Sequence, residues 1–405
     1  MRLPRRRRTS SWLVGALLVA ILGGGYGYRT LTRPLPRLVP PYRLRRLYIH
    51  TRVGALAWPD YEAAVGVAAD GILETHGAQR PVPIASVAKL ITALSVLRVR
   101  PLGYGQPGPM ITLSRADVGL YKRYAAEDGS VVPVRRGERI SEFQMLEAML
   151  LPSANNIADS LARWAFGSIR VYSAFANRYV ARLRLAHTRV GGDASGFDPR
   201  TTSTASDLVR LGEIALTNPV LAGLVGQRTA SGIPVAGTLD NTNFLLGRAG
   251  VVGIKTGNTN QAGGVFVAAA VLTVNARPTT IVSAVMGAPT LVTALRRSLP
   301  LIRSAEANFG PVVVVSAGTV VGRYRPPWAT AMEASPSHDL VVDTWHGSTV
   351  AITATLHPVP ASAHVGQAVG GLRITSTRRR AQAAVTLRLR TAPRQPSLWW
   401  RLLHP

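Results

Sequence analysis

The pattern of hydrophobic and polar residues divides the chain into an apolar N-terminal stretch, a long region of mixed helical and strand patterns, and a C-terminal region of short β-branched runs. The N-terminal stretch is uncharged and mostly apolar from Ser11 to Tyr28, and it follows the basic cluster Arg5 to Arg8. This arrangement predicts an export signal with a cytoplasmic N-terminus. Because no clean Ala-x-Ala site follows, we expect an uncleaved membrane anchor; cleavage near residues 23–25 is the alternative.

The middle of the chain alternates between helical spacing and β-rich runs. Apolar residues recur at helical spacing in the segments 86–98, 142–151 and 157–166. Ser141 and Gln144 are spaced as a capping box that starts the second of these helices. Two β-hairpins are indicated, one from the runs 63–67 and 72–75 around Asp70-Gly71, and one from the runs 265–274 and 281–286 around residues 275–278. Helices mixed with hairpins predict an α/β domain.

The C-terminal region changes to short β-branched runs separated by Pro and Gly, at residues 312–315, 340–342, 349–356 and 383–389, which predicts a small all-β domain. An extended linker behind the anchor is indicated by four prolines, Pro34, Pro36, Pro40 and Pro41. For the tail with Trp399-Trp400 we expect a frayed or packed end, with contact to the membrane interface as the alternative. The predicted organisation is a basic tip and anchor (1–28), a linker (29–44), a catalytic domain (45–305), a β-sandwich-like domain (306–391) and a tail (392–405).

The composition of the chain excludes some kinds of functional site and argues against others. The chain has 405 residues and no cysteine, which excludes disulfides and thiolate metal sites, and its eight histidines form no HExxH pattern, so we expect no metal and no cofactor. The formal net charge is +27, but the arginines are spread along the chain without a nucleic-acid-binding motif, so we expect no nucleic-acid partner. Only Lys89, Lys122 and Lys255 are lysines. A buried lysine can serve as a neutral base, whereas arginine cannot lose its proton.

Three short motifs follow one another in the middle region: Ser86-Val87-Ala88-Lys89, Ser153-Ala154-Asn155 and Lys255-Thr256-Gly257. Each motif alone is weak evidence, because such short patterns arise by chance in many chains. Their combination is much stronger, because the first motif opens an apolar helix and the third precedes a strand. Together they predict a site for nucleophilic catalysis by a serine with a lysine base.

The residue types suit this chemistry. On a helix, positions i and i+3 share a face, so Lys89 can lie beside the Ser86 hydroxyl and remove its proton. Burial and the nearby cation Lys255 would depress the pKa of Lys89, as a neutral base requires. Ser153 would relay a proton to the leaving group, and Asn155 would orient Lys89 or the substrate amide. Lys255 and Thr256 would hold a substrate carboxylate, while Gly257 allows close approach of the ligand.

The motif trio resembles that of penicillin-binding proteins and β-lactamases. The sequence is most similar to the low-molecular-mass D-alanyl-D-alanine carboxypeptidases over about residues 55–305, including the blocks 83–94, 137–155, 203–208 and 253–263. Residues 365–370 resemble, more weakly, the β-sandwich domain that follows in this family. The resemblance implies an α/β fold of the penicillin-binding-protein and β-lactamase type, with an antiparallel sheet flanked by helices and followed by a small all-β domain.

The resemblance also implies an activity and roles for the residues. The enzyme would be an extracytoplasmic serine-type carboxypeptidase that removes the terminal D-Ala from peptidoglycan stem peptides and binds β-lactams as covalent inhibitors. Ser86 would form the acyl-enzyme, Lys89 would accept its proton, Ser153 would assist proton transfer and Lys255 would bind substrate. Backbone N–H groups of Ser86 and Asn258 would form the oxyanion hole.

Two positions depart from the pattern of the carboxypeptidase family. Asn156 stands where the family often has Asp, and Thr280 stands where it often has a carboxylate-binding Arg, for which Arg277 is the candidate substitute.

Two other functions are alternatives to the carboxypeptidase. A class A β-lactamase carries the same trio but adds a deacylating Glu soon after the second motif. No Glu occurs between Glu147 and Glu213, which favours the peptidase. A non-enzymatic wall-binding scaffold would be expected to show a broken motif, and none is broken.

Overall fold

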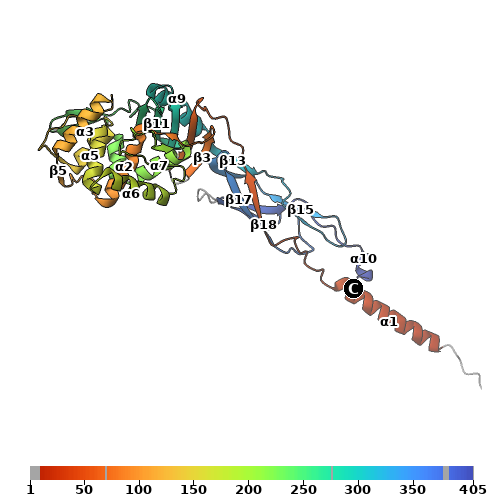
Figure 1. The fold of residues 1–405 in the computed structure, drawn as a ribbon. Coiled ribbons are helices and arrows are strands. Elements are labelled where there is room, and N and C mark those ends of the chain that lie inside the picture. Colours follow the sequence, from red (N-terminus) through yellow and green to blue (C-terminus); the bar gives the residue numbers. More distant parts are fainter. Residues whose placement is uncertain (1–9, 69–70, 275–276, 377–382, 405) are drawn as a thin grey trace, which may run out of the picture. The chain divides into compact units, whose positions relative to one another are not determined.

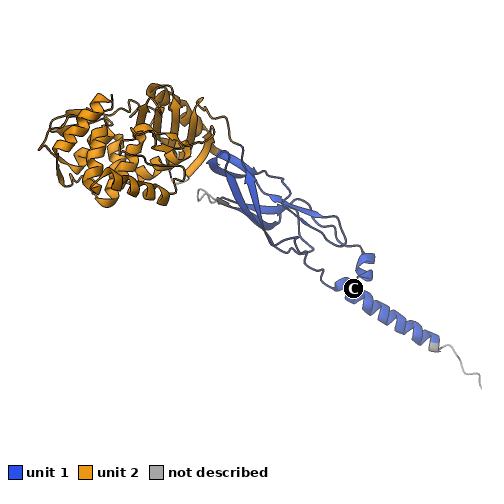
Figure 2. Ribbon diagram, viewed as in Figure 1, with its two compact units in different colours: residues 1–52, 311–405 blue, residues 53–310 orange. Residues whose placement is uncertain are grey.

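In the computed structural model the chain forms two compact units, one of residues 53–310 and one of residues 1–52 together with 311–405 (Figures 1 and 2). The structure describes all residues except 1–9, 69–70, 275–276, 377–382 and 405. The turn expected at 275–278 and the Asp70 part of the first hairpin turn lie partly outside the described residues.

Unit 53–310 is built on a five-stranded antiparallel sheet with the strand order β10-β11-β12-β2-β3. The strands are β2 (Glu62–Val67), β3 (Gly71–His76), β10 (Val251–Thr259), β11 (Gly263–Val274) and β12 (Arg277–Ala288). Both hairpins expected from the hydrophobic pattern are therefore present, as β2-β3 and β11-β12.

Helices pack against this sheet on both sides and against one another. They are α2 (Ala88–Val99), α3 (Arg115–Ala126), α4 (Glu142–Leu150), α5 (Asn155–Phe166), α6 (Ile169–Arg182), α7 (Ala205–Thr217), α8 (Pro219–Gly226) and α9 (Leu291–Ala307). The capping box expected at Ser141 and Gln144 is formed at the start of α4, where both reciprocal hydrogen bonds are present. Short ladders join β4 (Val82–Pro83) to β7 (Thr202–Ser203), β5 (Met110–Thr112) to β6 (Arg139–Ser141), and β8 (Thr229–Ile233) to β9 (Gly237–Asp240).

Strand β11 shows why this sheet is buried on both faces. Successive side chains of a strand point to opposite faces. Val265, Val267 and Ala269 accordingly pack in one apolar cluster with Leu208 and Leu211 of α7. Phe266, Ala268 and Ala270 pack in another cluster with Leu295 and Ile302 of α9. The sheet is thus the middle layer between α7 and α9, and it holds β10 in a fixed position beside the helical layer that contains α2 (Figure 1).

The second unit is mainly a six-stranded sheet with the order β1-β17-β18-β19-β15-β14, and a separate pair β13-β16. The strands are β1 (Leu44–His50), β13 (Phe309–Val315), β14 (Gly322–Tyr324), β15 (Met332–Pro336), β16 (Leu340–Trp345), β17 (Thr349–Leu356), β18 (Ala368–Ser376) and β19 (Ala384–Leu389). In β17 every second residue is buried, as expected for a sheet with one face on a core.

The N-terminal part of this unit differs from the organisation predicted from the sequence. Residues 44–50, expected at the linker end and the start of the catalytic domain, form β1, which pairs with β17 of the C-terminal sheet. Within the predicted linker, Leu38 is buried and forms a β-bridge with Val359. The physical reason is that Leu38, Leu47 and Ile49 pack against the apolar cluster of the C-terminal sheet.

Two helices complete this unit: α1 (Ser10–Thr32) and α10 (Leu398–Leu403). Helix α1 continues four residues beyond the expected anchor end at Tyr28. Over Trp12–Thr32 it is long and apolar enough to cross a membrane. A length and composition of this kind fit either a membrane anchor or a signal sequence.

Candidate active site

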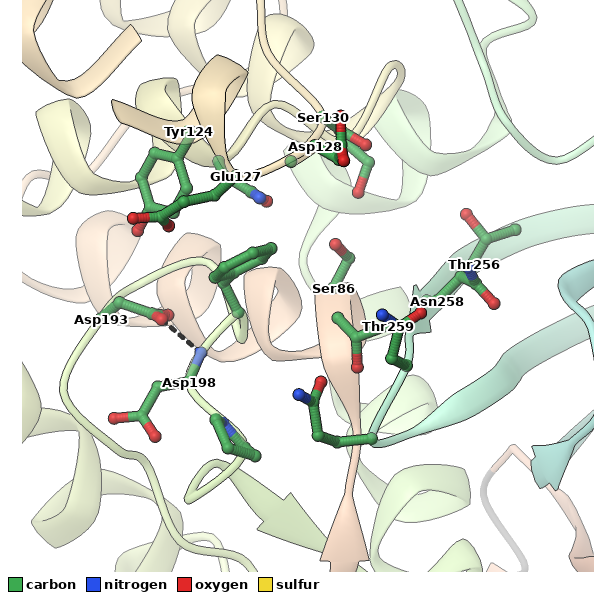
Figure 3. Close-up of a pocket in the computed structure, with 18 of the residues that line it drawn as sticks. Ser86, Tyr124, Glu127, Asp128, Ser130, Asp193, Asp198, Thr256, Asn258 and Thr259 are labelled. Carbon is green, nitrogen blue, oxygen red and sulfur yellow. Dashed lines mark hydrogen bonds between the residues drawn. The ribbon is translucent and has the colours of Figure 1, made fainter. Parts of the chain in front are cut away.

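Ser86 lies in a short 3₁₀ turn, η1 (Ala85–Val87), that leads directly into α2. Its neighbours Ala85 and Val87 are buried, while Ser86 itself is half-buried and faces a cleft of about 750 Å³. Figure 3 shows Ser86 near the centre of this cleft, with Thr256, Asn258 and Thr259 on one side and Asp193 and Asp198 on another. A hydroxyl in this position is open to a ligand while its backbone is held by the core.

Lys89 is placed one helical turn beyond Ser86 and is fully buried. Its Nζ lies 2.7 Å from the Oγ of Ser86, 2.7 Å from the Oδ1 of Asn155 and 3.0 Å from the carbonyl oxygen of Ser195. An ammonium has three donors, so these three acceptors fix the direction of the side chain. The structure therefore brings Ser86, Lys89 and Asn155 together; the helical spacing predicts only the contact between Ser86 and Lys89.

The surroundings of Lys89 favour its neutral form. Burial lowers the pKa of Lys89 well below 10.5, and the charge of Lys255 lowers it further, while Asp193 and Asp159 act in the opposite direction. A lysine with a depressed pKa can accept a proton near neutral pH. The arrangement can therefore activate the hydroxyl of Ser86 as a nucleophile.

The second motif presents a hydroxyl and an amide to the same cleft. Ser153 has a left-handed backbone conformation (φ 67°), is buried, and lines the cleft. Within the described residues its Oγ has no hydrogen-bond partner, so it is available to a ligand. Asn155 is the first residue of α5, and its backbone N–H donates to the carbonyl oxygen of Ser130 at 2.7 Å.

Asn156, the departure from the family pattern, has a structural role. It is fully buried, and its side-chain oxygen accepts a hydrogen bond from the N–H of Val132 at 3.1 Å. Its side-chain nitrogen donates to the carbonyl oxygen of Val132 at 2.9 Å. An amide satisfies both backbone groups, and this position therefore holds the 130–132 loop against α5 without facing the cleft.

The third motif lies on β10, the edge strand beside η1. Lys255 is buried, and its Nζ lies 3.2 Å from the carbonyl oxygen and 3.4 Å from the Oγ1 of Thr256. The hydroxyl of Thr256 is also 2.5 Å from that of Thr242, which lines the cleft as well. Burial lowers the pKa of Lys255 to about 7. Asn258 is exposed and lines the cleft beyond Gly257.

Gly257 is needed because β10 passes very close to the nucleophile turn. A Cβ at this position would lie 2.9 Å from the carbonyl oxygen of Ile84 and 3.2 Å from the backbone nitrogen of Ser86. We expect Gly257→Ala to lower the acylation rate of Ser86 by about 10- to 100-fold, because it moves the nucleophile relative to the bound carbonyl. The rate of modification by a fluorescent penicillin measures this.

The matched control is Gly119→Ala on α3, where a Cβ meets no atom within 4 Å. That variant should acylate at the wild-type rate and be as stable as the parent or slightly more so. Equal rates for Gly257→Ala and Gly119→Ala would show that the close approach of β10 does not position Ser86.

The sequence motifs did not identify the loop from Asp193 to Asp198. Asp193 accepts hydrogen bonds from the backbone N–H groups of Ser195 at 2.8 Å, Gly196 at 2.6 Å and Asp198 at 2.5 Å. It thereby fixes the Ser195 carbonyl that receives Lys89. Gly196 has a φ of +77°, and a Cβ there would lie 2.0 Å from the carbonyl oxygen of Ala85. The Asp, Ser and Gly of this segment indicate a turn, but nothing in the sequence places it against Lys89.

Asp159 of α5 supports the other side of the same loop. It accepts hydrogen bonds from the hydroxyl of Tyr124 at 2.8 Å and from the N–H of Ala194 at 2.9 Å. Arg123 forms an ion pair with it at 3.1 Å. Its burial raises the pKa of Asp159 above the ordinary value. These contacts tie α3, α5 and the 193–198 loop into one frame around Lys89.

Arg277 does not join the site. In the sheet, Gly257 lies opposite Val265 of β11, whereas Arg277 lies opposite Val274 at the other end of that strand. Val265 and Val274 are nine positions apart along β11, which corresponds to about 30 Å of extended strand. The proposed substitution of the carboxylate-binding arginine by Arg277 is therefore wrong, because the register of the hairpin places it too far from the cleft.

No group of three or more His, Cys, Asp or Glu side chains is arranged to hold a metal ion in the described part of the chain. The groups nearest the nucleophile that suit acyl transfer are the hydroxyls of Ser86 and Ser153, which line the cleft, and the amine of Lys89 behind Ser86.

The family model of D-alanyl-D-alanine carboxypeptidases matches residues 62–290. The D-alanyl-D-alanine carboxypeptidase DacD of Escherichia coli is 27% identical over 247 residues, which is 60% of this chain and 61% of that protein. A D-alanyl-D-alanine endopeptidase of Pseudomonas aeruginosa is 30% identical over 199 residues, 47% of this chain and 60% of that protein. The matches thus span about 60% of the length of these relatives.

A solved structure shows the same fold. Penicillin-binding protein 5 from Haemophilus influenzae superposes with a TM-score of 0.58 at 21% identity, covering 83% of this chain and 99% of that chain. The expected fold, an antiparallel sheet flanked by helices and followed by a further β region, is thereby confirmed. Since the family model covers more than half of the chain, including all three motifs, the chain belongs to the D-alanyl-D-alanine carboxypeptidase family.

Proposed function

We propose that this protein is a serine-type D-Ala-D-Ala carboxypeptidase that removes the terminal D-Ala from peptidoglycan stem peptides. The observation that carries the proposal is the 2.7 Å contact between the Nζ of a fully buried Lys89 and the Oγ of Ser86, at the floor of an open cleft. Family membership supports the same reading.

In the proposed reaction, neutral Lys89 takes the proton of Ser86, and Oγ attacks the carbonyl carbon of the penultimate D-Ala. The negative charge on the carbonyl oxygen is stabilised by the backbone N–H groups of Ser86 and Asn258. The C–N bond then breaks as Ser153 relays the proton held by Lys89 to the leaving amine, which returns Lys89 to its neutral form, and D-Ala departs. Water then attacks the ester carbonyl carbon as Lys89 takes a proton from it, and the bond between that carbon and Oγ breaks as Lys89 returns the proton to Ser86, which releases the shortened peptide.

Lys255, Thr256 and Thr242 would receive the terminal carboxylate. The two threonine hydroxyls lie in contact, and Lys255 lies behind them. The family arginine that often binds this carboxylate has no substitute in Arg277, so recognition would depend on these three groups. A charge-assisted contact is stronger than a neutral one, so the protonation of Lys255 matters for binding.

The protonation states of Lys89 and Lys255 should make kcat/KM depend on pH. Acylation needs neutral Lys89, so kcat/KM should rise as the pH increases through the depressed pKa of Lys89. Lys255 holds a carboxylate only while protonated, and its pKa is about 7 in the free protein, so kcat/KM for a carboxylate-ended peptide should fall above about pH 7. Steady-state kinetics of D-Ala release between pH 5 and 10 would show both limbs.

The alkaline limb can be assigned with Lys255→Arg, because arginine stays charged throughout this range. The variant should lose the alkaline fall while keeping the acid limb. An alkaline limb that is unchanged in Lys255→Arg would show that Lys255 is not the group that titrates.

The proposed activity is tested by incubating the purified full-length chain with a peptide ending in D-Ala-D-Ala and with a labelled penicillin. D-Ala release together with stable penicillin labelling supports the carboxypeptidase. Rapid penicillin turnover would instead indicate a β-lactamase, which the absence of Glu from 148 to 212 argues against. Neither release nor labelling would indicate a non-enzymatic scaffold.

Endopeptidase action on cross-links is a second candidate, because one relative carries that name at 30% identity. A cross-linked muropeptide dimer distinguishes the two reactions, since an endopeptidase converts it to monomers and a strict carboxypeptidase does not.

We also propose that α1 is retained as a membrane anchor and that residues 53–310 act outside the cytoplasm. The basic segment before α1 and the apolar composition of Trp12–Thr32 support this orientation. The substrates proposed above are located there.

A further inference from the structure

Helix α10 is attached to the last turns of α1, although 365 residues separate the two helices in the sequence. The hydroxyl of Tyr26 donates to the carbonyl oxygen of Leu402 at 2.9 Å, and the guanidinium of Arg401 donates to the carbonyl oxygen of Leu31. Trp400 packs edge-on against Trp328 with ring centroids 5.0 Å apart. Figures 1 and 2 show α10 beside this end of α1, within one unit.

The position of this contact along α1 sets its depth relative to a membrane. At 1.5 Å per residue the 23 residues of α1 span about 34 Å, slightly more than a hydrocarbon core of about 30 Å. If α1 crosses the bilayer, its last turn, from Arg29, reaches the headgroup layer. The contacts of α10 with Tyr26 and Leu31 bring α10 to the same layer.

The exposed side chains of this region suit that layer. Trp399 is 75% exposed, Leu403 is 72% exposed and Tyr28 is 74% exposed. Tryptophan and tyrosine are enriched where a membrane meets water, and exposed leucines on a short helix gain from contact with acyl chains.

A small cavity of about 270 Å³ lies where α1, the segment after it and α10 meet. Two guanidiniums, from Arg33 and Arg401, and the imidazole of His404 line it. Among the described residues, no Asp or Glu forms an ion pair with any of these three side chains. His404 is stacked on Trp400 at 4.5 Å, which holds its ring at the cavity. The cavity therefore presents unpaired positive charge at the expected level of the lipid phosphates.

We propose that this cavity binds the phosphate of an anionic phospholipid headgroup in the outer leaflet. Arginine is suited to phosphate because its planar fork donates two parallel hydrogen bonds to phosphate oxygens. A lipid rather than a soluble phosphate is favoured because Thr30, which lies near the end of the apolar span, lines the cavity. In addition, Trp399 and Leu403, which are neighbours of cavity residues in the sequence of α10, are exposed. Headgroup binding would fasten the C-terminal end of α1 and helix α10 at one point of the membrane surface. This inference rests on the proposed retention of α1.

The direct test is native mass spectrometry of the detergent-purified full-length chain, titrated with phosphatidylglycerol or phosphatidylcholine of the same acyl chains. We expect one phosphatidylglycerol to be retained in preference to phosphatidylcholine. Arg33→Gln and Arg401→Gln should each weaken its binding about fivefold, and Arg373→Gln, an exposed arginine on β18, should not. Equal binding of the two lipids, or an equal effect of Arg373→Gln, would overturn the proposal. Displacement of the lipid by millimolar inorganic phosphate would also overturn it, in favour of a soluble anion.

The absence of cysteine allows a second measurement in vesicles that contain phosphatidylglycerol. A fluorophore on Leu403→Cys should show blue-shifted emission and be quenched by lipid-borne quenchers, while one on Val365→Cys, 59% exposed in the native chain, should report water. Equal, water-like emission at both sites would contradict membrane contact of α10. Alkaline carbonate extraction separates the two hypotheses: release of the chain overturns the anchor, whereas a retained chain without lipid preference overturns only the headgroup site.

Discussion

Replacing Lys89 with arginine is expected to reduce the rate of Ser86 acylation by roughly a thousandfold, the typical contribution of a general base. The guanidinium stays protonated at any working pH and cannot take the proton of Ser86. It is also larger than the ammonium, in a site where Lys89 is fully buried and already contacts three acceptors. The rate of labelling by a fluorescent penicillin, followed by stopped flow, measures the effect.

The sequence provides a matched control, because Lys122 on α3 is exposed and lies outside the residues that line the cleft. Lys122→Arg should acylate at the wild-type rate. A circular dichroism melt of both variants would show whether the folded state is retained. If Lys89→Arg, folded, acylated as fast as Lys122→Arg, then Lys89 would not be the base.

The second large effect is expected from Ser86→Ala, which should lower D-Ala release to the background rate, a loss of the order of a millionfold for a removed nucleophile. The fold should persist, because Lys89 keeps the Asn155 and Ser195 acceptors and Ser86 makes no core contact that an alanine cannot make. D-Ala release from a D-Ala-D-Ala peptide, measured with excess enzyme, gives the residual rate.

Ser95→Ala on the same helix is the control for this change. The hydroxyl of Ser95 is buried without a hydrogen-bond partner among the described residues, so its removal should leave activity unchanged and stability equal or higher. Release that survives in Ser86→Ala at a measurable fraction of the wild-type rate would mean that another group is the nucleophile.

The hydrophobic pattern predicted much of the catalytic unit, because local signals there agree with the tertiary structure. The apolar, β-rich runs at 63–67 and 265–274 became β2 and β11, and the Ser141 capping box starts α4. The spacing of Ser86 and Lys89 on one helical face gave their contact directly, because it depends only on helix geometry. Asn155 also contacts Lys89, although 66 positions separate them in the sequence. The second motif suggested this contact, but only the tertiary fold brings the two side chains together.

Other features depend on contacts that no local pattern encodes. The strand Leu44–His50 pairs with Thr349–Leu356, about 300 residues away, and its sequence reads equally well as the start of the catalytic unit. Asp193 acts through backbone N–H groups of its own loop, and such a loop has no signature that distinguishes it from an ordinary turn. Arg277 is close in sequence to the expected position, but the hairpin register alone decides which end of the sheet it occupies.

Ser86 is expected to become acylated as D-Ala leaves the substrate. The most direct test is to quench the full-length chain rapidly after mixing with a D-Ala-D-Ala peptide or with penicillin, and then to locate the adduct by peptide mass mapping. We predict a penicillin adduct that persists on the peptide containing Ser86, stoichiometric D-Ala release from the peptide substrate, and loss of both in Ser86→Ala. An adduct on a different residue, or D-Ala release by Ser86→Ala, would show that Ser86 is not the nucleophile.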